Sequence, residues 1–189
     1  MLEWDCMKNK GLIEIIFYAR GGQGAKSAAE IVAQAVVTDG KFVQAFPSFG
    51  PERSGAPTET YLRISDQAIR THEPILDPDI IVVLDETLLK SEKNHAGIWI
   101  VNSAKSESDL KKMISSGKKI YPIDANKISI EVVGQPRPNT VILGKLIQVS
   151  KVARIESVIQ EFKKIFEGKL GKEATDKNIE AIKKSYDSK

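Results

Sequence analysis

The feature that most constrains this chain is a glycine cluster that follows an apolar run. Residues 13–18, IEIIFY, are typical of a buried strand, and the cluster RGGQG occupies residues 20–24. In residues 25–39, polar side chains recur at every fourth position, as on the exposed side of a helix. The remaining apolar side contains Ala28, Ile31, Val32, Ala35 and Val36. The sequence therefore predicts a strand, a glycine turn and a helix that Gly40 ends.

Further segments predict an alternation of strands and helices. A short strand is expected at residues 42–46, and residues 58–65 alternate as a half-exposed strand would, with Thr60, Leu62 and Ile64 on one side. Continuous apolar runs, typical of strands covered on both faces, occupy residues 80–86, 97–102 and 118–124. The pattern predicts an α/β fold, a three-layer α/β/α single domain with a mostly parallel, mixed sheet.

Length and composition favour one domain. The 189 residues, 41% of them hydrophobic, can bury one good core, so we expect a single domain over residues 1–189. Residues 1–10 read as a loose N-terminal lead and residues 155–189 as C-terminal helices. In the last of these, residues 174–186, Ile179 and Ile182 form a thin apolar stripe among charged residues. Such a stripe suits docking to a surface or to a partner chain.

Charge and hydropathy disfavour two classes of partner. The formal net charge of +3 is spread without a basic block, which is weak support for nucleic-acid binding. No apolar run approaches the roughly 20 residues that cross a bilayer. The first residues are unlike a signal peptide. We therefore expect a cytoplasmic protein that binds neither nucleic acid nor membrane.

Cysteine and histidine are scarce. Cys6 is the single cysteine, and His72 and His95 are the two histidines. One thiol can form no disulfide within the chain and cannot hold an iron–sulfur cluster unaided. We expect no metal site in this chain.

The glycine cluster lies where ligands bind in α/β folds, because glycines let backbone amides approach a phosphate beside a helix N-terminus. It matches no complete nucleotide motif. The dinucleotide pattern G-x-G-x-x-G has Ser27 in place of its third glycine, and a P-loop would need glycines at Arg20 and Ala25. Asp85 and Glu86 end an apolar run, as acids that position Mg²⁺ in NTPases do. An anion cradle and a tight turn for helix packing both stay open.

A second glycine- and proline-rich stretch, QAFPSFGPERSGAP, occupies residues 44–57. Its prolines stiffen it, and its glycines turn it. Phe46 and Phe49 are costly to leave in water, so they pack beneath the stretch or meet another subunit. Arg53 either pairs with Glu52 or grips a carboxylate or phosphate.

Four stretches stand in order along the chain: ARGGQGAKSAAEIVAQA, QAFPSFGPERSGAPTETYLRIS, IIVVLDETLL and PNTVILGKL. Together they resemble the gamma subunit of 2-oxoacid:ferredoxin oxidoreductases, of which pyruvate synthase is the best-known member. The resemblance runs from residue 13 to residue 149 and continues more loosely through the C-terminal helices. The chain departs from the family at Ala19, where glycine is usual, and at Ser54, where a second arginine is common.

The resemblance implies a subunit of an enzyme complex, without catalytic residues of its own. Such a complex cleaves a 2-oxoacid, pyruvate by default, on thiamine diphosphate with Mg, and passes electrons through 4Fe–4S clusters to ferredoxin or flavodoxin. It delivers the acyl group to coenzyme A (CoA). Alpha, beta and delta (ferredoxin-like) subunits would be the partners and would hold most cofactors. The isolated chain is expected to bind no cofactor, to be inactive, and to form homodimers through its uncovered surface.

The residues expected to contact the coenzyme come from the two glycine-rich stretches. They are Arg20, Gly21, Gly22, Gln23, Gly24, Phe49, Gly50, Pro51, Glu52, Arg53 and Gly55. Two alternatives stay open: a free-standing protein that binds nucleotide or phosphate through the GGQG loop, and a pure assembly subunit without a ligand.

Overall fold

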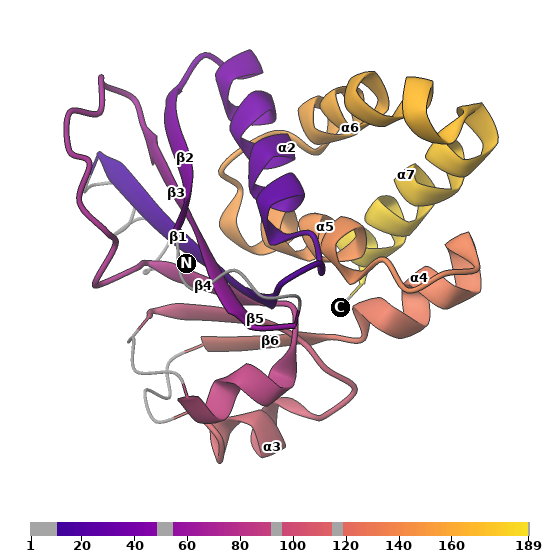
Figure 1. Ribbon diagram of the computed structural model, residues 1–189, viewed down its shortest axis with the longest axis horizontal. Helices are drawn as coiled ribbons and strands as arrows, with labels where there is room; N and C mark the ends of the chain where they lie inside the picture. Colours follow the sequence, from indigo (N-terminus) through magenta and orange to yellow (C-terminus); the bar gives the residue numbers. More distant parts are fainter. Residues whose placement is uncertain (1–10, 49–54, 92–95, 115–118, 189) are drawn as a thin grey trace.

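A computed structural model describes residues 11–48, 55–91, 96–114 and 119–188. Its centre is a six-stranded sheet in the order β2-β3-β1-β4-β5-β6 (Figure 1). Along the chain the strands are β1 (Leu12–Arg20), β2 (Phe42–Ser48), β3 (Pro57–Ser65), β4 (Ile80–Val83), β5 (Ile98–Asn102) and β6 (Lys119–Ile123). β1, β4, β5 and β6 run parallel, whereas β3 is antiparallel to both of its neighbours. The predicted α/β fold with a mixed sheet is confirmed.

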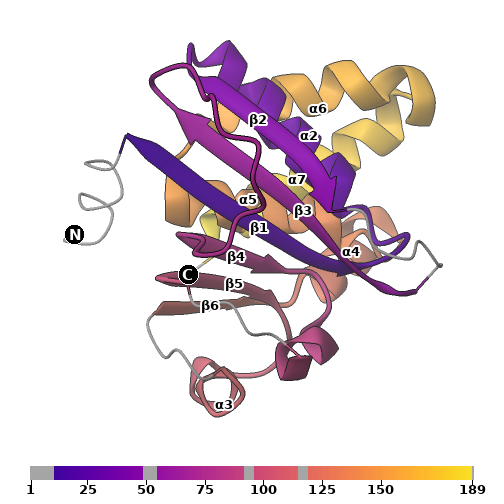
Figure 2. The ribbon, with the colours of Figure 1, turned by 60° about the vertical axis from the view of Figure 1, so that its left-hand side comes forward.

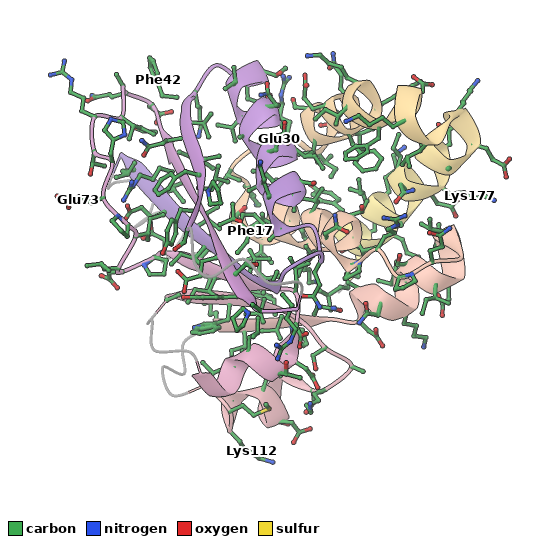
Figure 3. All side chains as sticks on the ribbon, viewed as in Figure 1. Phe17, Glu30, Phe42, Glu73, Lys112 and Lys177 are labelled. Carbon is green, nitrogen blue, oxygen red and sulfur yellow. The ribbon has the colours of Figure 1, made fainter. Side chains whose placement is uncertain are left out.

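The longer helices lie on one face of the sheet (Figures 1 and 2). They are α2 (Ala25–Thr38), α4 (Ala125–Val133), α5 (Pro138–Ser150), α6 (Ile155–Leu170) and α7 (Lys172–Asp187). Phe17 of β1, labelled in Figure 3, is fully buried and belongs to the core between the sheet and these helices. No helix within the described ranges is long and apolar enough to cross a membrane.

The opposite face has a thinner cover. It consists of the 3-10 helix η1 (Glu86–Ser91), the short helix α3 (Glu107–Lys111) and the connection from β3 to β4. Leu88, Leu110 and Ile75 from these three segments form a second core with Ile81 and Trp99 of the sheet. Helices or turns thus cover both faces, and β4 and β5 are buried throughout, as their continuous apolar runs predict. β4 is shorter than expected, because the strand ends at Val83 and Glu86 begins η1.

The strand, glycine turn and helix predicted from residues 13–40 are present as β1, the loop and α2. The apolar side of α2 is buried as predicted. Gly40 follows the helix with a φ of +84°, and its amide donates to the carbonyl of Val37 at 2.9 Å. This positive φ explains why a glycine follows the helix.

β3 differs from the half-exposed strand that its alternation predicts. Its residues from Thr60 to Ser65 are all buried, including Arg63, which is 2% exposed. Arg63 Nε donates to Glu14 Oε1 at 2.7 Å, and another of its nitrogens donates to the carbonyl of Glu73 at 2.6 Å. The prediction was wrong because the connection from β3 to β4 covers this side, and because Glu14 of β1 and the carbonyl of Glu73 in the connection pair with the charge of Arg63.

The C-terminal helix α7 also differs from expectation. Its Ile182 is fully buried in the chain's own core, and α7 packs against α4, α5 and α6. The stripe that suggested docking to a partner is therefore used inside the subunit. A close approach to α5 makes this packing possible: a Cβ added to Gly144 would lie 2.1 Å from the carbonyl oxygen of Ile182 and 2.7 Å from the amide nitrogen of Tyr186.

We predict that Gly144→Ala forces α5 and α7 apart. The free energy of unfolding should fall by about 1–3 kcal/mol or more, since the added methyl group meets backbone atoms that cannot rotate away. Urea denaturation of the purified chain measures this change. Gly168→Ala is the control, because an added Cβ in this exposed part of α6 meets nothing within 4 Å. That change should stabilise the helix slightly, and equal effects of the two substitutions would contradict the close-packing account.

Candidate functional site

The glycine loop connects the carboxyl end of β1 to the N-terminus of α2. Gly22 and Gly24 have φ values of +95° and +82°, which residues with a side chain rarely adopt. Gly24 is also closely packed, since an added Cβ would lie 2.5 Å from Nδ2 of Asn139 in α5. The loop conformation therefore requires glycine at both positions.

Several groups of the loop are held by bonds within the chain. The amide of Arg20 donates to Gln23 Oε1 at 2.7 Å, and the amide of Gln23 donates to the carbonyl of Arg20 at 3.0 Å. Gly21 donates to the carbonyl of Ala56 at 2.8 Å and accepts from the amide of Gly55 at 3.2 Å. The loop is thus fastened to the end of the second glycine-rich stretch. Sequence reasoning grouped these two stretches, and the structure brings Gly21 and Gly55 together.

The guanidinium of Arg20 makes three hydrogen bonds at the same place. Its Nε donates to Asp85 Oδ2 at 3.0 Å, and its two terminal nitrogens donate to Thr87 Oγ1 at 2.8 Å and to the carbonyl of Gly55 at 3.1 Å. Gln23 Nε2 adds a bond to the same Asp85 oxygen at 3.1 Å. Arg20 therefore fastens the loop to Asp85, which follows the end of β4. Sequence analysis compared Asp85 with acids that position Mg²⁺. In the structure Asp85 is instead the partner of Arg20.

Asp85 is held in its charged form. Desolvation by partial burial raises its pKa, but hydrogen bonds from Thr87 and Gln23 and the charge of Arg20 outweigh that effect, so the pKa lies below its usual value. The neighbouring Glu86 also has a lowered pKa, through hydrogen bonds from Lys105 and Ser103. Both acids are committed to partners within the chain.

Other amides of the loop and helix are free to meet a ligand. The amides of Gly22, Gly24, Ala25, Lys26 and Ser27 donate no hydrogen bond to any residue that the structure describes. The first intrahelical bond of α2 runs from Ala28 to the carbonyl of Gly24. A helix N-terminus carries partial positive charge, so these free donors are suited to an anion.

Three of these residues, Gly22, Gly24 and Ser27, line a cavity of about 940 Å³. Its walls come from the start of α2, the connection from α4 to α5, the start of α5, the end of α6 and the first turns of α7. Its apolar lining residues are Ile31, Phe162, Phe166 and Leu170. Arg137 and Lys172 are among its cationic ones. A cavity of this size and mixed lining suits a ligand with an apolar and an anionic part.

The expected site residues are only partly placed together. Gly22, Gln23 and Gly24 line the cavity, whereas Arg20, Gly21 and Gly55 do not line it and instead make the bonds that hold the loop. The remaining five candidates, Phe49, Gly50, Pro51, Glu52 and Arg53, lie outside the described residues. Within the described ranges, no three His, Cys, Asp or Glu side chains gather into a group that could hold a metal ion.

Sequence reasoning missed the far wall of the cavity. Asn139 and Thr140 at the start of α5 and Asn178 in α7 all line it. The stretch PNT carried a signal for the first two, since Pro138 at the first helical position marks a helix start. No local signal identified Asn178, because its place depends on how α7 packs.

The fold and the loop define a class: an α/β domain with a glycine loop after its first strand and a ligand-sized cavity between that loop and the helices. Residues 14–188 match the family described as pyruvate ferredoxin/flavodoxin oxidoreductase, so the chain belongs to that family. The match spans almost the whole described chain. It confirms the resemblance that the four sequence stretches indicate.

Individual relatives agree with this membership. The chain is 42% identical over 182 residues to the "Pyruvate/ketoisovalerate oxidoreductases common subunit gamma" of Pyrococcus furiosus, covering 93% of this chain and 96% of the relative. It is 42% identical to the "Pyruvate synthase subunit PorC" of Methanothermobacter marburgensis, covering 93% and 97%. The crystal structure of pyruvate oxidoreductase subunit PORC from Thermotoga maritima superposes with a TM-score of 0.83 at 35% identity, covering 94% of this chain and 97% of that one. The chain is a gamma-type subunit of a multisubunit oxidoreductase.

We predict that Asp85→Asn weakens the support of the loop. At neutral pH the free energy of unfolding should fall by only about 1 kcal/mol, because the pair with Arg20 is partly exposed and screened by water. The folded-state pKa of Asp85 is depressed. Its contribution is therefore present above the unfolded-state pKa and lost as the pH falls through the folded-state pKa.

Urea denaturation at neutral and acid pH tests this, and the difference between the wild type and Asp85→Asn should shrink as the pH is lowered. Asp66→Asn is the matched control, since Asp66 is 73% exposed and lies 3.9 Å from Lys41. An unchanged difference across the acid range would contradict the charged pair.

Proposed function

We propose that this chain is the gamma subunit of a complex that converts a 2-oxoacid and CoA to acyl-CoA and CO2, with reduction of ferredoxin or flavodoxin. The observation that carries the proposal is the match of residues 14–188 to the oxidoreductase family. Near-complete coverage of gamma subunits from other organisms supports a subunit of the same kind.

In this proposal the chain itself performs no redox step. Thiamine diphosphate, Mg and the 4Fe–4S clusters belong to alpha, beta and delta (ferredoxin-like) companions in a cytoplasmic complex. The single cysteine supports this division, because cluster ligation takes several thiolates. The acids beside the glycine loop support it too, since Asp85 and Glu86 already have partners in the chain.

The choice of 2-oxoacid lies outside this subunit, with pyruvate as the default substrate. The gamma subunit of Pyrococcus furiosus is named as common to pyruvate and ketoisovalerate oxidoreductases. A subunit shared between complexes of different substrates does not select between them. The same reasoning applied to this chain assigns substrate choice to its partners.

In this proposal, the chain contributes to the reaction by contacting CoA. Gly22, Gly24 and Ser27, whose amides donate no bond to the described residues, line a cavity with both apolar and cationic residues. CoA combines phosphates with an apolar ring system, which fits both kinds of lining. Arg20, Gly21 and Gly55 hold the loop in place, and residues 49–53 complete the contact in this proposal.

One observation favours a second candidate, an assembly role without a ligand. Arg20, Gly21 and Gln23 already have hydrogen-bond partners in the chain. In that case the glycines only allow α2 to pack tightly, and changes in the loop would alter complex formation without changing the use of CoA.

We predict that Gly24→Ala raises the KM for CoA of the reconstituted complex by about tenfold, because distorting the loop moves its amides and sacrifices bonds to charged oxygens. The value of kcat at saturating CoA should stay near that of the wild type. Steady-state kinetics with varied CoA measures both quantities.

Gly40→Ala is the control for the backbone strain. Gly40 has a φ of +84°, close to the +82° of Gly24, but lies at the other end of α2 with nothing near an added Cβ. The two variants share the strain, and only Gly24→Ala should change the KM. Equal kinetics in both would favour the assembly role.

The purified chain alone should be colourless and free of iron. It should not turn over any 2-oxoacid, and activity should appear only when the alpha, beta and delta subunits are added. Absorption spectra, iron analysis and ferredoxin reduction assays check this. Turnover by the chain alone would overturn the proposed function.

A further inference from the structure

The strand β2 forms one edge of the sheet (Figure 2). It pairs with β3 on one side, and no strand among the described residues pairs with its other side. Each of the other described strands has buried residues, but none of the seven residues of β2 is buried. An edge strand presents a row of backbone donors and acceptors that can pair with another chain.

The edge formed by β2 has little protection against such pairing. Charged side chains, proline and a short strand discourage contact between sheet edges. The sequence of β2, FVQAFPS, contains no charged residue, and Pro47 removes one donor. The strand at the other edge, β6, has five residues and includes both Lys119 and Pro122. β2 is therefore the longer and less protected of the two edges.

Both cores of the subunit reach this edge and are incompletely covered there. Val43 is half-buried against the core on the side of the longer helices. Phe46 is half-buried against the core of the opposite face, with its ring centroid 5.1 Å from that of Tyr61. Phe42, labelled in Figure 3, is 50% exposed. Apolar area left in water is unfavourable, so one more strand beside β2 would stabilise both faces.

We propose that β2 pairs with β2 of a second copy of this chain and joins the two six-stranded sheets into one continuous sheet. Each copy offers the same surface to the other in a twofold dimer, so the two strands run antiparallel. The twofold axis passes beside Ala45, the middle residue of β2, which is exposed and small. Such a dimer brings two sets of companion subunits into one assembly.

The sequence of β2 is complementary to itself in this arrangement. With Ala45 opposite its own copy, Val43 lies opposite Pro47 of the second copy, on the face that carries the longer helices. On the other face, Phe42 lies opposite Ser48 of the second copy, so a large side chain meets a small one. No charge lies opposite a like charge, which would oppose pairing. These matches favour a second copy over an unrelated strand.

Analytical ultracentrifugation of the full chain over a range of concentrations tests the pairing. The wild type should form a dimer. Ala45→Lys places two like charges beside the twofold axis, so the dissociation constant should rise by at least about tenfold. Ile130→Lys is the matched control, since Ile130 is 55% exposed on α4 and its replacement should leave the dimer intact. Circular dichroism spectra of both variants should match that of the wild type.

Disulfide cross-linking tests the register. Cys6→Ser first removes the single native thiol. In that background Ala45→Cys should give a linked dimer on mild oxidation, since opposite Cα atoms of an antiparallel pair lie about 4.5–5.5 Å apart. Ser48→Cys is the control and should not link, because the two copies of Ser48 lie about 20 Å apart along the strands.

The inference does not rest on the use of CoA, so the two can fail separately. A chain that stays monomeric at every concentration, or a dimer that Ala45→Lys leaves intact, would overturn it. Linking of Ser48→Cys as readily as of Ala45→Cys would also overturn the proposed register. A monomeric chain whose Ala45→Lys variant no longer enters the complex would overturn the second copy and assign the edge to a companion subunit.

Discussion

The ion pair between Arg20 and Asp85 is the interaction on which the glycine loop depends. It joins the ends of β1 and β4, and the same guanidinium reaches Thr87 and the backbone of Gly55. Two residues of the loop have positive φ, and bonds between Arg20 and Gln23 fix its turn. The amides of Gly22, Gly24, Ala25, Lys26 and Ser27 donate no hydrogen bond to the described residues. The residues that hold the loop, Arg20 among them, thus differ from those whose amides are free for a ligand.

Close helix packing likewise shapes another part of the cavity. Gly144 allows α7 to lie directly against α5, and this contact brings the first turns of α7 opposite the glycine loop. Preorganised donors cost little reorganisation when a ligand arrives, which favours binding. The family assignment and the geometry are thus consistent: a subunit without metal-binding clusters among its described residues still has a preformed, positively biased cavity.

Local sequence patterns predicted the parts of the fold that local forces decide. The strand, glycine turn and helix at the N-terminus and the buried strands β4 and β5 follow directly from apolar periodicity. The errors concern packing between distant segments: Arg63 is buried because Glu14 and Glu73 meet it, and Ile182 is buried because α7 folds back. The cavity combines residues more than a hundred positions apart, so only Gly22, Gln23 and Gly24 could be predicted as part of its lining.

The position of α7 has a consequence for the order of events during synthesis. Domains fold as units while the ribosome extends the chain. Here Ile182, which the ribosome adds long after the sheet strands, completes the core beside α5, and α7 also forms one wall of the cavity. A growing chain that has only reached α6 has its strands but leaves this part of α5 uncovered. The subunit can therefore present a finished cavity to a partner or a ligand only after α7 has left the exit tunnel.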